Sequence, residues 1–220
     1  MPELTIDTAI AARLPGRTDA EGFPTEDAWE TAPPISFCGD WQGKNEDRRR
    51  ATQVRLLWTP EFLFLRFDAR YREITVFPDA DADGRRDCLW DRDVCEAFLQ
   101  PDPSEARSYK EIEVAPNGFW IDLDIAAGEK QDLRSGLRRR VNIEPQTKEW
   151  RAVLVVPMES LTTRFDASVV WRANFYRVEG ACEPRFYSAW RPTLTPQPNF
   201  HVPQAFGGLV FTEPGSKIRR

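Results

Sequence analysis

The run Asp79-Ala80-Asp81-Ala82-Asp83-Gly84 places carboxylates at alternate positions before a glycine. Hard oxygen ligands followed by a glycine that permits a tight turn match the first half of a calcium-binding loop. The second half departs from that pattern, because Trp90 stands where a bidentate glutamate is expected. We therefore predict Asp79, Asp81 and Asp83 as ligands of a structural calcium ion, with a solvated acidic turn as the alternative. No essential cofactor is expected.

A second set of carboxylates lies on segments that alternate like β-strands. Two of them facing one cleft could serve as the acid and base of a glycoside hydrolase, which needs roughly 5–9.5 Å between the groups. Pairing with arginine is the alternative reading, and the chain has 25 Arg. Nucleophilic catalysis is disfavoured, because Gly-x-Ser-x-Gly is absent and His201 is the only histidine. The five carboxylates are Glu96, Glu111, Glu113, Asp122 and Asp124.

Seven of the eight tryptophans divide into two groups. One group lies within strand-like patterns, where core packing is expected; it comprises Trp58, Trp120, Trp150 and Trp171. Trp41, Trp90 and Trp190 instead stand among polar or turn residues. A tryptophan in such a setting either covers the core or offers a flat apolar platform, which suits the C–H face of a sugar ring.

Composition and charge limit the possible functions. The chain has 220 residues, of which 41% are hydrophobic and 30% charged, so a packed core is expected. Its net charge of -5 argues against nucleic-acid binding, which needs a positive field. No run approaches the roughly 20 apolar residues of a membrane span, so no membrane partner is expected. Residues 1–7 show no signal peptide, which predicts a cytoplasmic protein, or a secreted one if the chain has been trimmed.

The four cysteines show no Cys-x-x-Cys spacing. With no secretion signal, we expect four reduced thiols. A bond between Cys88 and Cys95 is the alternative if these residues lie on neighbouring strands.

Strand patterns separated by Pro- and Gly-rich turns dominate the chain and predict an all-β sandwich of nine or ten antiparallel strands. An Asn117-Gly118 hairpin joins two of these strands. Short helical turns are expected near residues 25–30 and 157–161. The predicted strands cover residues 51–58, 62–67, 93–100, 109–114, 119–125, 137–143, 150–156, 169–178, 185–190 and 207–211. We expect one domain over residues 25–212, with a leading arm over 1–24 and a tail over 213–220.

Several segments, taken in order, resemble the family 9 carbohydrate-binding modules and their relatives. Residues 89–99 (LWDRDVCEAFL) are similar to the family's W-x-x-D-x-x-E-x-F segment, and residues 109–118 to the strand and turn that follow it. Residues 171–177 and 190–207 also fit. The resemblance runs from about residue 25 to 212. It implies a jelly-roll-like sandwich of the kind shared with DOMON domains, without enzymatic activity.

The resemblance also implies a binding site for a mono- or oligosaccharide. Two tryptophan rings would hold a terminal sugar while Glu, Asn and Arg side chains bind its hydroxyl groups. By motif position these residues are Trp90, Glu96, Asn117, Arg177 and Trp190. Family modules are usually joined to secreted glycoside hydrolases, so glycan-degrading enzymes are expected partners. Two alternatives stay open: a glycoside hydrolase with paired carboxylates, and a structural or protein-interaction sandwich whose sugar slot is filled.

Overall fold

The computed structural model describes residues 8–213 and is almost entirely β-structure. Thirteen strands form one strongly curled sheet within these residues. They are β1 (Thr8–Arg13), β2 (Ile35–Phe37), β3 (Thr52–Trp58), β4 (Phe62–Arg70), β5 (Val94–Gln100), β6 (Tyr109–Val114), β7 (Trp120–Ala126), β8 (Glu129–Asp132), β9 (Arg138–Glu144), β10 (Glu149–Pro157), β11 (Trp171–Glu179), β12 (Phe186–Ala189) and β13 (Gly207–Thr212). The predicted all-β class is confirmed.

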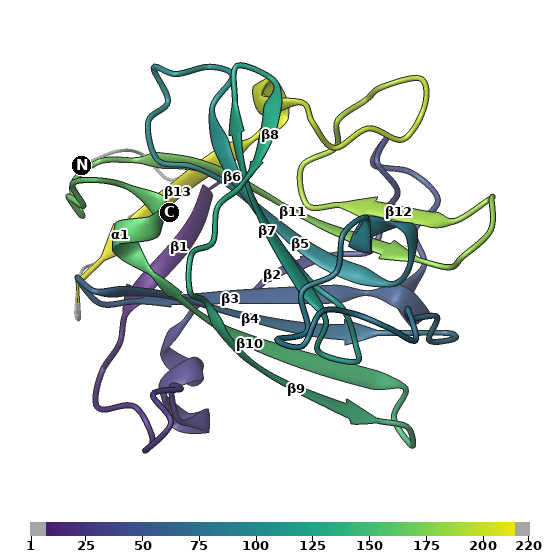
Figure 1. Cartoon of the computed structure of the whole chain (residues 1–220), viewed down its shortest axis with the longest axis horizontal. Coiled ribbons are helices and arrows are strands. Elements are labelled where there is room, and N and C mark those ends of the chain that lie inside the picture. Colours follow the sequence, from purple (N-terminus) through teal and green to yellow (C-terminus); the bar gives the residue numbers. More distant parts are fainter. Residues whose placement is uncertain (1–7, 214–220) are drawn as a thin grey trace.

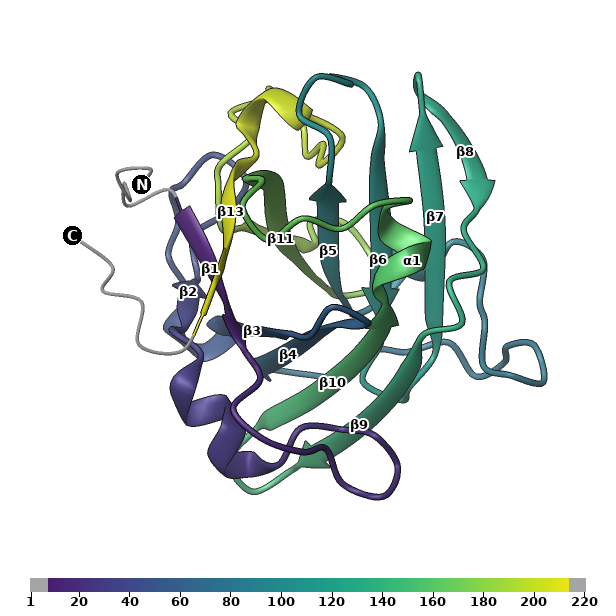
Figure 2. The same ribbon diagram turned by 90° about the vertical axis from the view of Figure 1, so that its left-hand side faces the viewer.

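The sheet folds back on itself into two layers (Figures 1 and 2). Its strand order is β8-β7-β6-β5-β11-β13-β1-β3-β4-β10-β9, with β12 paired to β11 and β2 to β3. Figure 2 shows β1 and β13 on the side where the layers join. The pairs β1–β13 and β1–β3 are parallel, whereas the other pairs are antiparallel.

All ten predicted strands are present, and three further strands were missed. β1 lies inside the predicted leading arm, where Ala9 and Ala11 are the buried residues and give only a weak apolar signal. β2 has three residues, and the four residues of β8 are all exposed and polar. Such strands form because neighbouring strands offer free backbone groups, and side-chain alternation does not reveal them. The predicted tail lies outside the described residues except for Glu213.

Helical structure is limited to short turns in the described part of the chain. The α-helix α1 covers Met158–Leu161. Four 3-10 turns are η1 (Glu26–Thr31), η2 (Arg48–Arg50), η3 (Leu89–Asp91) and η4 (Pro203–Ala205). Two of these five elements occur where the sequence predicted helical turns. No helix among the described residues has the length and apolar character needed to cross a membrane.

Two apolar clusters cover the two faces of the β5-β6-β7-β11 layer. The larger cluster fills the space between the layers and includes Trp58, Trp120, Trp150 and Trp171, as predicted. The second lies on the outer face of the layer, under loops that contain Leu89 and residues 200–206. An antiparallel sheet commonly leaves one face to solvent. Here the outer face is largely covered, and the cover leaves a pocket.

All four cysteines are free thiols. Cys95 points into the core between the layers, while Cys88 is exposed at the start of η3. The alternative of a Cys88–Cys95 bond is therefore wrong for this structure, because the two side chains do not share an environment.

Candidate functional site

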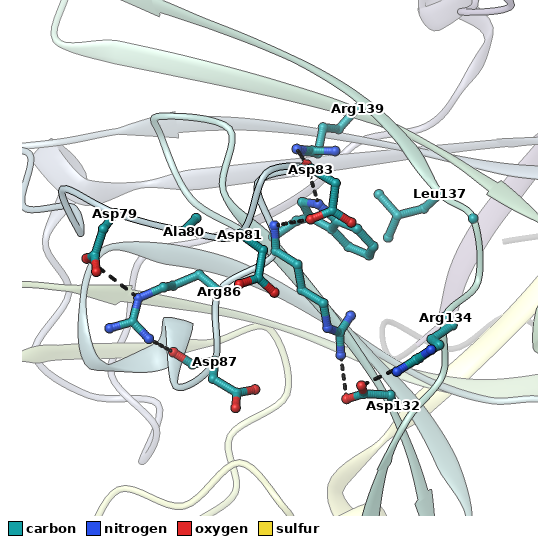
Figure 3. A pocket seen from close by; sticks show the side chains of 13 residues that line it. Asp79, Ala80, Asp81, Asp83, Arg86, Asp87, Asp132, Arg134, Leu137 and Arg139 are labelled. Atoms are coloured by element: carbon teal, nitrogen blue, oxygen red, sulfur yellow. Dashed lines mark hydrogen bonds and ion pairs between the residues drawn. The ribbon is translucent and has the colours of Figure 1, made fainter.

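Two cavities lie near residues that the sequence singled out. The larger, of about 910 Å³, is lined by the acidic run and by four arginines (Figure 3). Its charged groups neutralise one another: Arg85 bonds Asp122 and Asp132 at 2.7 Å each, and Arg86 lies 4.0 Å from Asp79. Two of the carboxylates that line this cavity, Asp79 and Asp132, are thus paired with arginines.

The acidic run does not converge on a point. Figure 3 shows the side chains of Asp79, Asp81 and Asp83 spread along the cavity wall. Asp83 caps the turn by accepting the backbone N–H of Arg85 at 3.0 Å. Within residues 8–213, the three carboxylates do not form a group with oxygens close enough to share one ion. The arrangement does not fit a preformed calcium loop, and calcium in this loop stays a prediction.

The smaller cavity, of about 150 Å³, opens on the outer face of the β5-β6-β11 layer. Aromatic rings form its walls, and carboxylates form its floor. Its lining residues are Trp90, Glu96, Phe98, Glu111, Lys130, Val178, Arg185, Tyr187, Pro198, Asn199, Phe200 and His201. A concave apolar lining with a few convergent polar groups is typical of a small-molecule site. We call this cavity the Trp90 pocket.

The indole of Trp90 is held at the pocket by local structure. It lies in η3, which begins after Cys88, a residue in the left-handed region with φ of 55°. Leu89 anchors the turn in the outer apolar cluster. Arg185 donates a 2.7 Å hydrogen bond to the Trp90 carbonyl, and the Lys130 ammonium lies 4.3 Å from the centre of the ring. The side chain is half-buried, so a ligand can reach it.

Strand pairing builds the floor of the pocket. Glu96 on β5 lies directly opposite Glu113 on β6, and Glu111 is two residues before Glu113 on the same face. All three carboxyls are buried. Burial, followed by the repulsion of the neighbouring carboxyls, raises the pKa of Glu96 and of Glu113 well above 4.5. The floor therefore carries acidic groups that cannot all ionise freely.

This floor makes stability depend on pH in a defined direction. Above pH 4.5 the unfolded chain releases protons that the folded state keeps on Glu96 and Glu113, so folding becomes less favourable as pH rises. We expect Glu113→Gln to lack the part of this loss that Glu113 causes. We compare the melting temperature of the variant with that of the wild type. The difference, variant minus wild type, should be positive and should increase by at least about 2 °C from acid to neutral pH. Calorimetric melting in metal-free buffer tests this. A constant difference would contradict it.

Aromatic packing fixes the walls. Tyr176 stacks on Phe200 with ring centres 4.1 Å apart and donates a 3.0 Å hydrogen bond to its carbonyl. The Tyr109 hydroxyl lies 2.7 Å from His201 Nδ1. Burial lowers the pKa of His201, which therefore favours the neutral imidazole. The polar edges of these rings are thereby held in fixed positions around the pocket.

The pocket brings together two of the five predicted ligand-binding residues, Trp90 and Glu96. Asn117 lies elsewhere: it is exposed in the β6–β7 turn, where its side-chain amide donates to the Phe77 carbonyl at 3.0 Å. Its role in this structure is to fasten a loop beside the site.

Arg177 lies on the wrong face for the predicted role. Its side chain is fully buried in the space between the layers, 3.3 Å from Glu179, 3.8 Å from Asp93 and over the Trp150 ring. Its neighbours Tyr176 and Val178 belong to the outer cluster. Because successive strand residues point to opposite faces, Arg177 cannot reach the pocket that its neighbours border.

Trp190 is also on the inner face. It packs against the core between the layers, with its ring 5.7 Å from that of Phe175, whereas Ala189 contributes to the outer cluster. The two tryptophans expected to form a slot are therefore separated by the sheet. The aromatic groups that accompany Trp90 in the pocket are Phe98, Tyr187, Phe200 and His201.

Sequence reasoning did not place several of the lining residues at the site. Glu111 was noted only as a strand carboxylate, although its strand face and alternation with Glu113 were readable. Lys130, Arg185 and Tyr187 carried no signal, because they reach the pocket from separate segments.

Comparison with known proteins supports a family and a fold. Residues 48–211 match the model of carbohydrate-binding family 9. An extracellular protein of Arthroderma benhamiae is 21% identical over 177 residues, which cover 73% of this chain and 78% of that protein.

The chain is also similar to solved structures. A candidate carbohydrate-binding protein from Bacteroides uniformis superposes with a TM-score of 0.72 at 16% identity, over 94% of this chain and 99% of the other. A family 9 module from Caldicellulosiruptor kristjanssonii in complex with cellotriose gives 0.62 at 13% identity, over 95% of each chain. The same TM-score and identity are found for a family 9 module from that organism in complex with glucose, over 97% of this chain and 100% of the other. At these identities the likeness concerns the fold.

Proposed function

The chain belongs to carbohydrate-binding family 9, and from this premise we propose that the Trp90 pocket binds the terminal unit of a saccharide. The observation that carries the proposal is the half-buried indole of Trp90 beside the buried carboxyls of Glu96 and Glu111 in one cavity. A sugar ring offers an apolar face to the indole and hydroxyl donors to carboxylate oxygens. The similar family 9 structures hold glucose and cellotriose, which makes these sugars the first ligands to test.

The proposed contacts use the free hydrogen-bonding capacity of the pocket. Glu96 Oε1 and Glu111 Oε2 are buried and accept no hydrogen bond within the described chain, so sugar hydroxyls would satisfy them. The long side chain of Lys130 now covers the indole; the sugar would take its place and receive a hydrogen bond from its ammonium. The volume of about 150 Å³ is below the about 300–1,000 Å³ of drug-sized pockets, so one sugar unit is expected inside.

Titration calorimetry of the full chain with glucose and cellotriose tests the proposal. We expect binding by the wild type and at least about tenfold weaker binding by Glu96→Gln, because the amide replaces an acceptor oxygen with a donor and leaves a buried group of the complex unsatisfied, which costs about 1–3 kcal/mol. Glu159→Gln, at an exposed position of α1, is the matched control and should bind like the wild type. Equal affinities of wild type and Glu96→Gln would contradict the role of Glu96.

The same proposal expects binding without turnover. Aryl glycosides should be left intact by the wild-type protein. Turnover that is lost in Glu96→Gln would instead support the hydrolase alternative, since two carboxylates of the pocket lie close together. Association with glycan-degrading enzymes stays a prediction of the sequence.

A further inference from the structure

The floor of the Trp90 pocket holds an unusual group of three carboxylates. Within residues 8–213, Glu96, Glu111 and Glu113 are the one set of three or more potential ligand side chains whose ligand atoms lie within 4.8 Å of one another. The β5–β6 register places Glu96 directly opposite Glu113. Like charges at directly opposed strand positions are destabilising, so a compensating group is needed.

The oxygens of this group lack hydrogen-bond donors outside the group. Among the described residues, no other side chain or backbone group donates to either oxygen of the fully buried Glu113, to Glu96 Oε1 or to Glu111 Oε2; Glu113 shares a hydrogen bond with Glu111 alone. Buried polar atoms in folded proteins nearly always have a partner. Glu113, which does not line the pocket, therefore has only the neighbouring carboxyls as partners. Clustering alone does not require a ligand, but this lack of donors indicates one.

The spacing suits a calcium-sized cation. Ca²⁺ binds six to eight oxygen ligands at about 2.3–2.6 Å, so two oxygens on opposite sides of one ion are about 4.8 Å apart. The three carboxyl groups satisfy that limit. Glu96 and Glu111 also line the open cavity, which leaves one side of the cluster accessible to water or ligand oxygens.

The surrounding charges agree with a divalent ion. Lys130 is the nearby cation with its ammonium over the Trp90 ring, while Arg185 pairs with Glu183 at 3.2 Å. A divalent ion would displace the protons that Glu96 and Glu113 hold in its absence, and together with Lys130 it would balance the three carboxylates that result. In the larger cavity of Figure 3, by contrast, arginines lie among the acidic groups and pair with Asp79 and Asp132.

We propose that Glu96, Glu111 and Glu113 bind one Ca²⁺-type cation at the floor of the Trp90 pocket. Waters complete its coordination in the free protein. With the cation in place, two neighbouring hydroxyls of a bound saccharide replace those waters on the ion, and these contacts take the place of the direct hydrogen bonds to Glu96 and Glu111. The cation thereby couples ion binding to sugar binding. This last step rests on the proposed function, whereas the cation site does not.

Terbium titration without sugar tests the site. Tb³⁺ occupies calcium sites, and its luminescence is sensitised by a nearby indole, which Trp90 supplies. We expect one Tb³⁺ per wild-type chain, displaced by Ca²⁺. Affinity should fall at least about tenfold in Glu113→Gln, because affinity follows the number of charged ligands. Asp81→Asn, in the acidic run, should bind like the wild type.

Three results would overturn the cation site. The first is no sensitised luminescence and no calorimetric heat with Ca²⁺. The second is that Asp81→Asn loses Tb³⁺ binding while Glu113→Gln binds Tb³⁺ like the wild type, which would place the ion in the acidic run. The third is binding heat from glucosamine but none from Ca²⁺, which would show that the three carboxylates bind the ammonium group of an amino sugar and not a metal ion. Melting curves check that Glu113→Gln is folded.

Repeating the sugar titration with Ca²⁺ and with chelator separates this inference from the proposed function. Sugar binding that weakens at least about tenfold in chelator supports the coupling. Ion binding without any sugar binding would reject the proposed function and leave the cation site standing. Sugar binding that is identical in both buffers would reject the coupling.

Discussion

Trp90→Ala is expected to weaken saccharide binding by at least about 30-fold. A central aromatic anchor typically contributes about 2 kcal/mol or more, and 1.4 kcal/mol is a factor of ten in affinity. The indole of Trp90 is the largest apolar surface among the residues that line the pocket. Truncation would remove the face on which the sugar ring stacks, while Leu89 would still hold the turn in place. Calorimetry with cellotriose measures the change.

Trp190→Phe is the control for this prediction. The ring of Trp190 lies against Phe175 on the other face of the layer, so its replacement by a smaller aromatic ring should leave sugar affinity within about twofold. If Trp90→Ala binds like the wild type, or if both variants lose affinity equally, the assignment of the pocket is wrong.

Arg177→Met is expected to cause the largest loss of stability, about 3–5 kcal/mol. The substitution leaves Asp93 and Glu179 buried without their cation, and removal of one partner from a buried ionic group costs about this much. Burial already raises the pKa of Asp93 and of Glu179. Both carboxyls are protonated and neutral at low pH, so the loss of unfolding free energy caused by Arg177→Met should grow as pH rises. Urea denaturation at acid and neutral pH measures it.

Two further variants make the result specific. Arg134→Met removes an exposed guanidinium that lies 3.7 Å from Asp132 and should change stability by no more than about 0.5 kcal/mol. The triple variant Arg177→Met, Asp93→Asn, Glu179→Gln should recover much of the loss, because no buried charge remains uncompensated. A single-variant loss below about 1 kcal/mol would show that Arg177 does not support the core.

Local patterns predicted most of the fold. The ten predicted strands were found, since apolar alternation reports directly on a half-buried strand and a short continuous apolar run, as in residues 62–67, on a strand covered on both faces. β1 and β8 were missed because one buries only small residues and the other is polar throughout. Backbone pairing with neighbours stabilises such strands, and those neighbours come from distant parts of the chain.

The structure brings together the predicted site residues that are close in the sequence and separates those that are distant in it. Trp90 and Glu96 are six residues apart, and one turn followed by one strand brings them into the same pocket. Arg177 and Trp190 each lie one residue from a side chain that faces the outer cluster. A shift of one position along a strand places a side chain on the other face of the sheet, and a loose motif does not fix the position to within one residue.

The amino-acid sequence by itself determined the all-β class, the tryptophans of the core and the pairing of Trp90 with Glu96, because each depends on alternation or contact within a few residues. Only the tertiary structure decided which face of the β5-β6-β11 layer carries the pocket and which distant side chains enclose it. Strand order and loop cover bring Glu113 opposite Glu96 and place Lys130 over Trp90. These contacts join segments whose separation along the chain contains no information about their separation in space.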